Sequence, residues 1–177
     1  ELRPGMSTYE IDRIGEEMIR SFGCEPSFKN YCGYPASVCV SIDEEVVHGI
    51  PCKEKFIQEG DIVSLDIGVI HKGYHSDAAR THAVGEISKE AALLIERTRQ
   101  SFKKFRRGIK LKSGMTLAVE PMINIGTPDV LWLDDEWTVI TADMSLSAHY
   151  ENTIIITEGR PEILTLTDSE IAAHIWE

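Results

Sequence analysis

Apolar residues recur every three or four positions near the start of the chain, and this spacing predicts an amphipathic helix over residues 7–22. Ser7 and Glu10 form the S-x-x-E pattern of a capping box at its beginning, and Gly23 follows as a stop. The positions that repeat at helical spacing are Ile11, Ile14, Met18 and Phe22. We therefore expect one face of this helix to pack against the rest of the protein.

A second periodic stretch predicts a helix over residues 88–105, with Ser88 as its cap. Its apolar face is formed by Leu94, Thr98, Phe102 and Phe105. A basic cluster stands at its end, where cations suit the helix dipole, and this explains the charges better than a binding patch does. The cluster contains Lys103, Lys104, Arg106 and Arg107. Residues 168–177 predict a short terminal helix.

Shorter runs of β-branched and aromatic residues, bounded by turn residues, predict strands in the rest of the chain. Residues 36–48 read as two short strands around a polar turn at Asp43-Glu44. A long strand, IVSLDIGVI, and its return, YHSDAARTHAV, flank a turn at His71-Lys72-Gly73. Four more strands are expected at 116–125, 129–134, 137–142 and 147–157, with a hairpin turn over residues 134–136.

Composition narrows the class of protein. A chain of 177 residues with 42% hydrophobic and 27% charged residues predicts one soluble globular domain. The net charge of −11 argues against nucleic acid as a partner, because phosphate backbones would be repelled. We see no signal peptide and no apolar run that would span a membrane. The cysteines, Cys24, Cys32, Cys39 and Cys52, form no CxxC pair, so we expect free thiols in a cytoplasmic protein without a zinc clip.

Two stretches of the sequence share one layout of glycine and acidic residues. In each, an acid stands six positions after a glycine, and another acid stands eight positions before a second glycine. The four acids are Asp66, Asp77, Glu120 and Glu151. Any one of them alone is most simply a solvent-facing residue on an edge strand. Four in matched positions within apolar β runs suggest a buried group that needs compensation, and two divalent cations bridged by shared carboxylates would satisfy them all.

Around these acids the sequence resembles type I methionine aminopeptidase, a metallopeptidase of the pita-bread fold. The matching stretches stand in family order between about residues 4 and 165: YCGYPASVCVSI, VVHGIP, EGDIVSLDIGV, GYHSDAARTHAVGEIS, KSGMTLAVEPMINIGT, LDDEWTVITAD and SLSAHYENTIIIT. The resemblance implies an α+β fold, with a pseudo-two-fold antiparallel sheet and helices on one face. It implies a single catalytic domain, 1–177, with pseudo-repeats at 1–86 and 87–165, the second shortened, and a tail at 166–177.

The resemblance also assigns roles to individual residues. The four acids would hold two divalent ions, Mn²⁺, Fe²⁺ or Co²⁺, with Asp77 and Glu151 bridging both and Glu120 also serving as acid/base. His48 would contact the substrate near the scissile bond, although a lone histidine beside a glycine turn is more often structural. The pocket for the methionine side chain would be lined by Tyr31, Tyr34, Cys39 and Trp137, which by themselves would pass as ordinary core residues.

The implied activity is removal of the N-terminal methionine from peptides and nascent proteins by a metal-activated water, close to the ribosome. Two alternatives remain open: a non-catalytic binding protein descended from the enzyme, and a pita-bread aminopeptidase of another specificity, such as for proline. The stretch YCGYPASVCVSI favours methionine, and retention of all four carboxylates argues against long drift.

One departure from the family pattern lies between Phe105 and Lys112. The family has a longer segment here, with a G-H-G-I-G motif whose histidine is a metal ligand and a further histidine that stabilises the transition state. This chain passes directly from SFKKF to RRGIKLKSGM. If this segment is truly deleted from the protein, we expect the ion held by Glu120 to lack a ligand, activity to be impaired, and the uncovered apolar surface to cause aggregation or a homodimer across the gap.

Overall fold

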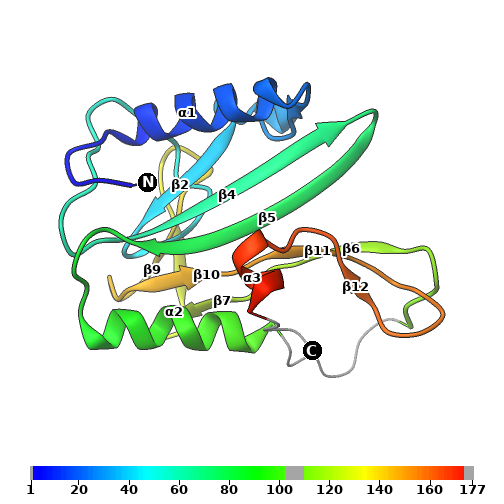
Figure 1. The fold of residues 1–177 in the computed structure, drawn as a ribbon. Helices are drawn as coiled ribbons and strands as arrows, with labels where there is room; N and C mark the ends of the chain where they lie inside the picture. Colours follow the sequence, from blue (N-terminus) through cyan, green and yellow to red (C-terminus); the bar gives the residue numbers. More distant parts are fainter. Residues whose placement is uncertain (1, 103–109, 174–177) are drawn as a thin grey trace.

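The computed structural model describes residues 2–102 and 110–173, and in this part of the chain antiparallel strands lie between two main helices (Figure 1). The helices are α1 (Thr8–Ser21), α2 (Lys89–Ser101) and α3 (Asp168–Ala172), with a 3₁₀ turn η1 at Tyr31–Gly33. α1 packs against the first-half strand β2 (Val38–Ile42), and α2 packs against strands of the second half. The predicted helices at 7–22, 88–105 and 168–177 are thus present, and the predicted ends at 103–105 and 174–177 lie outside the described residues.

The first half is built on one long hairpin, β4 (Ile62–His71) and β5 (Tyr74–Ala83), whose strands pair without a bulge from end to end. Lys72 and Gly73 connect them with positive φ angles of 50° and 82°, which suit the right-handed twist of a two-residue hairpin. β4 also pairs with β2 and with β1 (Glu25–Pro26). The predicted turn at His71-Lys72-Gly73 and its two strands are confirmed.

The second half consists of shorter strands distributed over three small sheets. The strands are β6 (Thr116–Val119), β7 (Met122–Asn124), β8 (Val130–Trp132), β9 (Val139–Thr141), β10 (Ser147–His149), β11 (Asn152–Ile155) and β12 (Glu162–Ile163). The sheets have the orders β12-β11-β6, β10-β7 and β3-β9-β8, where β3 is Glu45–Val47 of the first half. The predicted hairpin over 134–136 is confirmed by the antiparallel pairing of β8 with β9.

Two strands predicted as continuous, at 116–125 and 147–157, are broken in the structure. The first break is at Glu120-Pro121, where proline has no N–H to donate to a ladder. The second is at Tyr150-Glu151, because the Glu151 N–H leaves its own sheet and donates to the Ala79 carbonyl of β5 at 2.9 Å. Each break therefore turns one of the predicted acids out of its strand.

α1 begins as predicted, since the Ser7 side chain accepts the Glu10 N–H. Ile11 is buried with Val38, Val40 and other side chains in the main core. The rest of the predicted face, Ile14, Met18 and Phe22, is 39%, 57% and 73% exposed. These side chains line an apolar cavity of about 590 Å³ between α1 and the sheet. The helical period was correct, but only part of the apolar face is covered.

α2 is capped by Ser88, whose side chain accepts the Ala91 N–H at 3.0 Å. Of its predicted apolar face, Leu94, Thr98 and Phe102 are buried. Phe105 and the predicted basic cluster lie outside the described residues. Among the described helices, none is long and apolar enough to cross a membrane.

Candidate metal centre

The hairpin of β4 and β5 places the first two acids on one face of the sheet. Asp66 pairs with Ala79 across the hairpin, and Asp77 stands two residues before Ala79 on the same strand. Directly paired residues and residues two apart on a strand point to the same side of a sheet. Asp66 and Asp77 are therefore diagonal neighbours, although ten residues separate them in the sequence.

Backbone hydrogen bonds join the second half of the chain to this hairpin. The Glu151 N–H donates to the Ala79 carbonyl at 2.9 Å, so Glu151 lies beside the strand that carries Asp77. The Thr153 hydroxyl accepts the Asp77 N–H at 2.8 Å and donates to the Asp77 carbonyl at 2.9 Å. These contacts fix Glu151 against the two aspartates from a distant part of the sequence.

The two strand breaks bring the fourth acid to the same place. The Tyr150 N–H donates to the Pro121 carbonyl at 3.1 Å, so Glu120-Pro121 runs alongside Tyr150-Glu151. All four predicted carboxylates consequently gather at one point, three in one group and Glu120 in a second group that shares Glu151. In each group the potential donor atoms lie within 4.8 Å of one another.

The second group contains a residue that the sequence analysis missed. His149 joins Glu120 and Glu151, and both His149 and Glu151 are buried, at 2% exposure each. The sequence feature that could have pointed to His149 as a ligand is its position two residues before Glu151, in the run SAHYE. The family resemblance assigns no role to that position, and the sequence alone predicts only that His149 lies in a strand.

The four acids lie close together, and three of them have pKa values that the fold raises. Burial, followed by the charges of Asp77 and Glu151, raises the pKa of Asp66 well above its usual range. Burial is also the main cause that raises the pKa of Asp77, and it raises that of Glu151 to about 8. Asp66 Oδ1 and Asp77 Oδ1 have no hydrogen-bond partner among the described residues. Buried, unpaired carboxylate oxygens that converge at this distance fit a divalent metal ion.

In the metal-free protein, the free energy of unfolding of the wild type should fall relative to that of Glu151→Gln as the pH rises from 4.5 to about 8. The fold raises the pKa of Glu151 from 4.5 to about 8, so the folded state favours the protonated carboxyl. The stability that the protonated Glu151 carboxyl contributes is fully present below pH 4.5, and it is lost as the pH rises through about 8. Urea denaturation in EDTA would measure it, and a constant difference between the two proteins would contradict it.

Beside the four acids, most of the predicted substrate-binding residues lie close together. Cys39 pairs with Asp66 between β2 and β4, and Cys39 and Tyr34 are buried in one apolar cluster. Trp137 packs on this cluster, with its ring centroid 5.1 Å from that of Tyr34. His48 is exposed, and its ring centroid lies 6.1 Å from that of Trp137. The backbone of His48 has a positive φ of 60°. Four of the five predicted substrate contacts are thus adjacent.

Tyr31 is the exception. It begins η1 and is 69% exposed, and it is not among the side chains packed in the Tyr34 cluster. The resemblance implies that Tyr31 lines the methionine pocket, but its ring is exposed to solvent here. That role stays a prediction.

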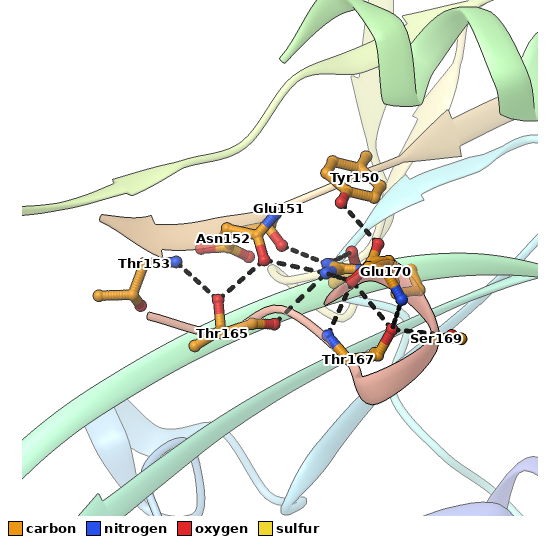
Figure 2. A network of polar contacts seen from close by, with 10 residues as sticks. Tyr150, Glu151, Asn152, Thr153, Thr165, Thr167, Ser169 and Glu170 are labelled. Atoms are coloured by element: carbon orange, nitrogen blue, oxygen red, sulfur yellow. Dashed lines mark hydrogen bonds and ion pairs between the residues drawn. The ribbon is translucent and has the colours of Figure 1, made fainter. Parts of the chain in front are cut away.

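A polar network holds the Glu151 backbone from behind (Figure 2). Arg80 donates to both carboxylate oxygens of Glu170, at 2.9 and 2.7 Å, and to the carbonyl of Glu151. The Tyr150 hydroxyl donates to Glu170 at 2.7 Å, and the Asn152 side-chain oxygen accepts from Arg80 at 2.9 Å. The network joins α3 to the loop that carries Glu151, so a partly buried ion pair supports the cluster of acids.

Comparisons with known proteins agree with this geometry. The sequence profile of metallopeptidase family M24 matches residues 1–110, which is more than half of the chain. The chain belongs to metallopeptidase family M24. Members of this family bind divalent metal, which accords with the acidic cluster. The methionine aminopeptidase of Clostridium acetobutylicum is 41% identical over 219 positions, covering 94% of this chain and 88% of the relative.

Solved structures of the M24 family confirm the predicted pita-bread fold. Methionine aminopeptidase from Thermotoga maritima superposes with a TM-score of 0.88 at 33% identity, covering 93% of this chain and 88% of that one. The prolidase from Pyrococcus horikoshii has a TM-score of 0.72 at 18% identity, covering 95% of this chain and 56% of its own, and indicates the fold alone. The 219 positions aligned with the clostridial relative exceed the 177 residues here, so that relative has residues that this chain lacks.

Proposed function

We propose that this chain is a methionine aminopeptidase that removes the N-terminal methionine from peptides and nascent proteins. The observation that carries the proposal is the convergence of Asp66, Asp77 and Glu151, in which one oxygen of each aspartate has no partner among the described residues, next to the apolar cluster that contains Tyr34 and Cys39. The 41% identity to a methionine aminopeptidase over nearly the whole chain supports this specificity. Ribosome proximity, a homodimer and a cytoplasmic location stay predictions.

The cofactor we propose is a pair of divalent ions. Asp66, Asp77 and Glu151 would hold one ion, and Glu120 and Glu151 would hold the other, so Glu151 would be shared. A bound pair would supply Lewis-acid activation of the scissile carbonyl and of the attacking water. Carboxylate donors favour hard or borderline ions, which supports Mn²⁺, Fe²⁺ or Co²⁺. That Asp77 also bridges is implied only by the family resemblance.

The chain's own side chains would bind the substrate and move its protons. Glu120 is the exposed member of the cluster, so it is the carboxylate best placed to exchange a proton with the peptide. His48 is exposed, with its ring next to Trp137, and would hydrogen-bond the scissile amide. Tyr34, Cys39 and Trp137 offer an apolar, partly aromatic surface that suits an unbranched thioether side chain.

The proposal predicts metal-dependent release of methionine. Purified protein supplied with Mn²⁺ or Co²⁺ should release free methionine from Met-Ala-Ser, measured by mass spectrometry, and EDTA should stop the reaction. Release of leucine from Leu-Ala-Ser should be about 10–200-fold slower, because a pocket shaped for one apolar side chain discriminates by only 1–3 kcal/mol.

The same assay separates the alternatives. Cleavage of Ala-Pro without release of methionine from Met-Ala-Ser would establish the other specificity that the prolidase-like fold allows. Tight metal binding with no cleavage of either peptide would establish a non-catalytic protein. Either result would overturn the proposed function.

A further inference from the structure

His149 is held rigidly beside the proposed metal centre. The Thr81 hydroxyl accepts the His149 N–H at 2.8 Å and donates to the His149 carbonyl at 2.9 Å. The side chains of Ser64 on β4 and Thr81 on β5 are hydrogen-bonded to each other at 2.8 Å. Both strands of the hairpin therefore help to hold the backbone of His149 at the end of β10. β10, which ends at His149, pairs with β7 in a register that sets His149 opposite Met122, two residues after Glu120. The position of the imidazole is therefore determined by the same strand breaks that position the acids.

One nitrogen of the His149 imidazole, Nε2, is available to bind an ion and lies close to Glu151. His149 Nε2 is buried and has no hydrogen-bond partner among the described residues. It lies 3.8 Å from Glu151 Oε2. Two donors bound to one ion at about 2.0–2.2 Å can be at most about 4.4 Å apart, so both atoms can reach the same ion. A hydrogen bond would require a shorter distance than 3.8 Å, so Glu151 does not satisfy this nitrogen.

We propose that His149 Nε2 is a ligand of the ion shared by Glu120 and Glu151. This inference rests on the metal centre of the proposed function and adds a nitrogen donor to it. The sequence had indicated that this ion lacks a histidine ligand and is held by oxygen atoms alone. With His149 the second ion has three side-chain ligands from this chain, two carboxylates and one imidazole.

The donor sets of the two ions then differ. Asp66, Asp77 and Glu151 form an all-oxygen set, whereas the second set contains imidazole. Imidazole favours Zn²⁺, Fe²⁺ and Co²⁺ over Mg²⁺, whereas carboxylates alone suit Mg²⁺ and Mn²⁺. The second ion should consequently be lost preferentially when His149 is replaced, and the first should not.

Titration of the metal-free protein with Co²⁺, followed by calorimetry and by visible absorption, tests the assignment without any peptidase assay. We expect wild-type protein to bind two equivalents. His149→Ala and His149→Gln should weaken the second equivalent by at least about 10–100-fold and leave the first unchanged. His48→Ala, the matched control for a nearby histidine outside both groups, should bind both equivalents as wild type does. Near-ultraviolet circular dichroism of each metal-free variant checks that it is folded.

Pulsed EPR of bound Mn²⁺ supplies a direct readout, because it detects coupling to an imidazole nitrogen. The coupling should be present in wild type and His48→Ala and absent in His149→Gln. If His149→Gln keeps the second equivalent at wild-type affinity, or if wild type shows no nitrogen coupling with two ions bound, His149 is not a ligand and the proposed function still stands. If wild type binds no divalent ion, both this inference and the proposed function are wrong.

Discussion

Replacing Glu151 with alanine is expected to abolish methionine release at every metal concentration. Glu151 belongs to both donor groups and is 2% exposed, so no other described carboxylate can take its place in both. Removing a shared ligand weakens both ions at once, and losses within one catalytic unit are not additive. The rate of methionine release from Met-Ala-Ser should stay at background throughout a Mn²⁺ or Co²⁺ titration. Asp77→Ala should behave similarly if Asp77 also bridges the ions.

Two controls make this result interpretable. Glu44→Ala changes a carboxylate in the turn between β2 and β3, outside both donor groups, and should keep the wild-type rate. Glu151→Gln keeps the shape of the side chain and removes its charge, so it should fold in EDTA and still fail to cleave. If wild type and Glu151→Ala share one residual rate across the titration, the catalytic interpretation of this chain is wrong.

Replacing Arg80 with alanine is expected to lower the free energy of unfolding by about 1–3 kcal/mol, because it leaves a partly buried carboxylate without the donors that satisfy both of its oxygens. The side chains of Arg80 and Glu170 are only 16% and 12% exposed. The pKa of Glu170 is held at about 2 by hydrogen bonds from Arg80, Thr167 and Tyr150, which outweigh the opposing effect of burial. The guanidinium also lies 4.1 Å from the centre of the Tyr150 ring. Urea denaturation at pH 7 would measure the loss.

The matched control is Arg13→Ala. Arg13 pairs with Glu17 on α1, but these side chains are 51% and 65% exposed, and an exposed pair contributes only about 0–1 kcal/mol. Arg80→Met combined with Glu170→Leu should recover much of the loss, since apolar residues need no compensating charge. Equal destabilisation by Arg80→Ala and Arg13→Ala would show that the network in Figure 2 contributes little.

The Glu151 and Arg80 substitutions both test the junction between the two halves of the chain. The metal cluster lies where two parts of the chain meet, and the Arg80 to Glu170 pair spans 90 positions of the sequence to hold that junction. Arg80→Ala should therefore also impair metal binding through the Glu151 backbone, whereas Glu151→Gln should leave the Arg80 network intact. Arg80 is thus a positioning residue, because its hydrogen bond to the cluster, within the described part of the chain, goes to the Glu151 carbonyl.

Much of this protein could be predicted from its sequence because the signals are local. The helical period of residues 8–21, the caps at Ser7 and Ser88, and the Lys72-Gly73 turn depend on neighbours within four positions along the chain. The paired acids were visible because a carboxylate in an apolar β run is costly wherever that strand packs. Pocket residues such as Tyr34 and Trp137 were recognised only through the family resemblance.

Tertiary structure alone decided the features that depend on register between distant strands. The break at Tyr150-Glu151 arises because Glu151 bonds to β5, a contact that no local pattern encodes, whereas the break at Glu120-Pro121 has a local cause in the proline. The same register buries His149 with its Nε2 facing Glu151, whereas Tyr31 is left exposed. Local propensity predicts where strands form, but the donor set of a metal site depends on which strands meet and at which residue, and long-range packing determines both.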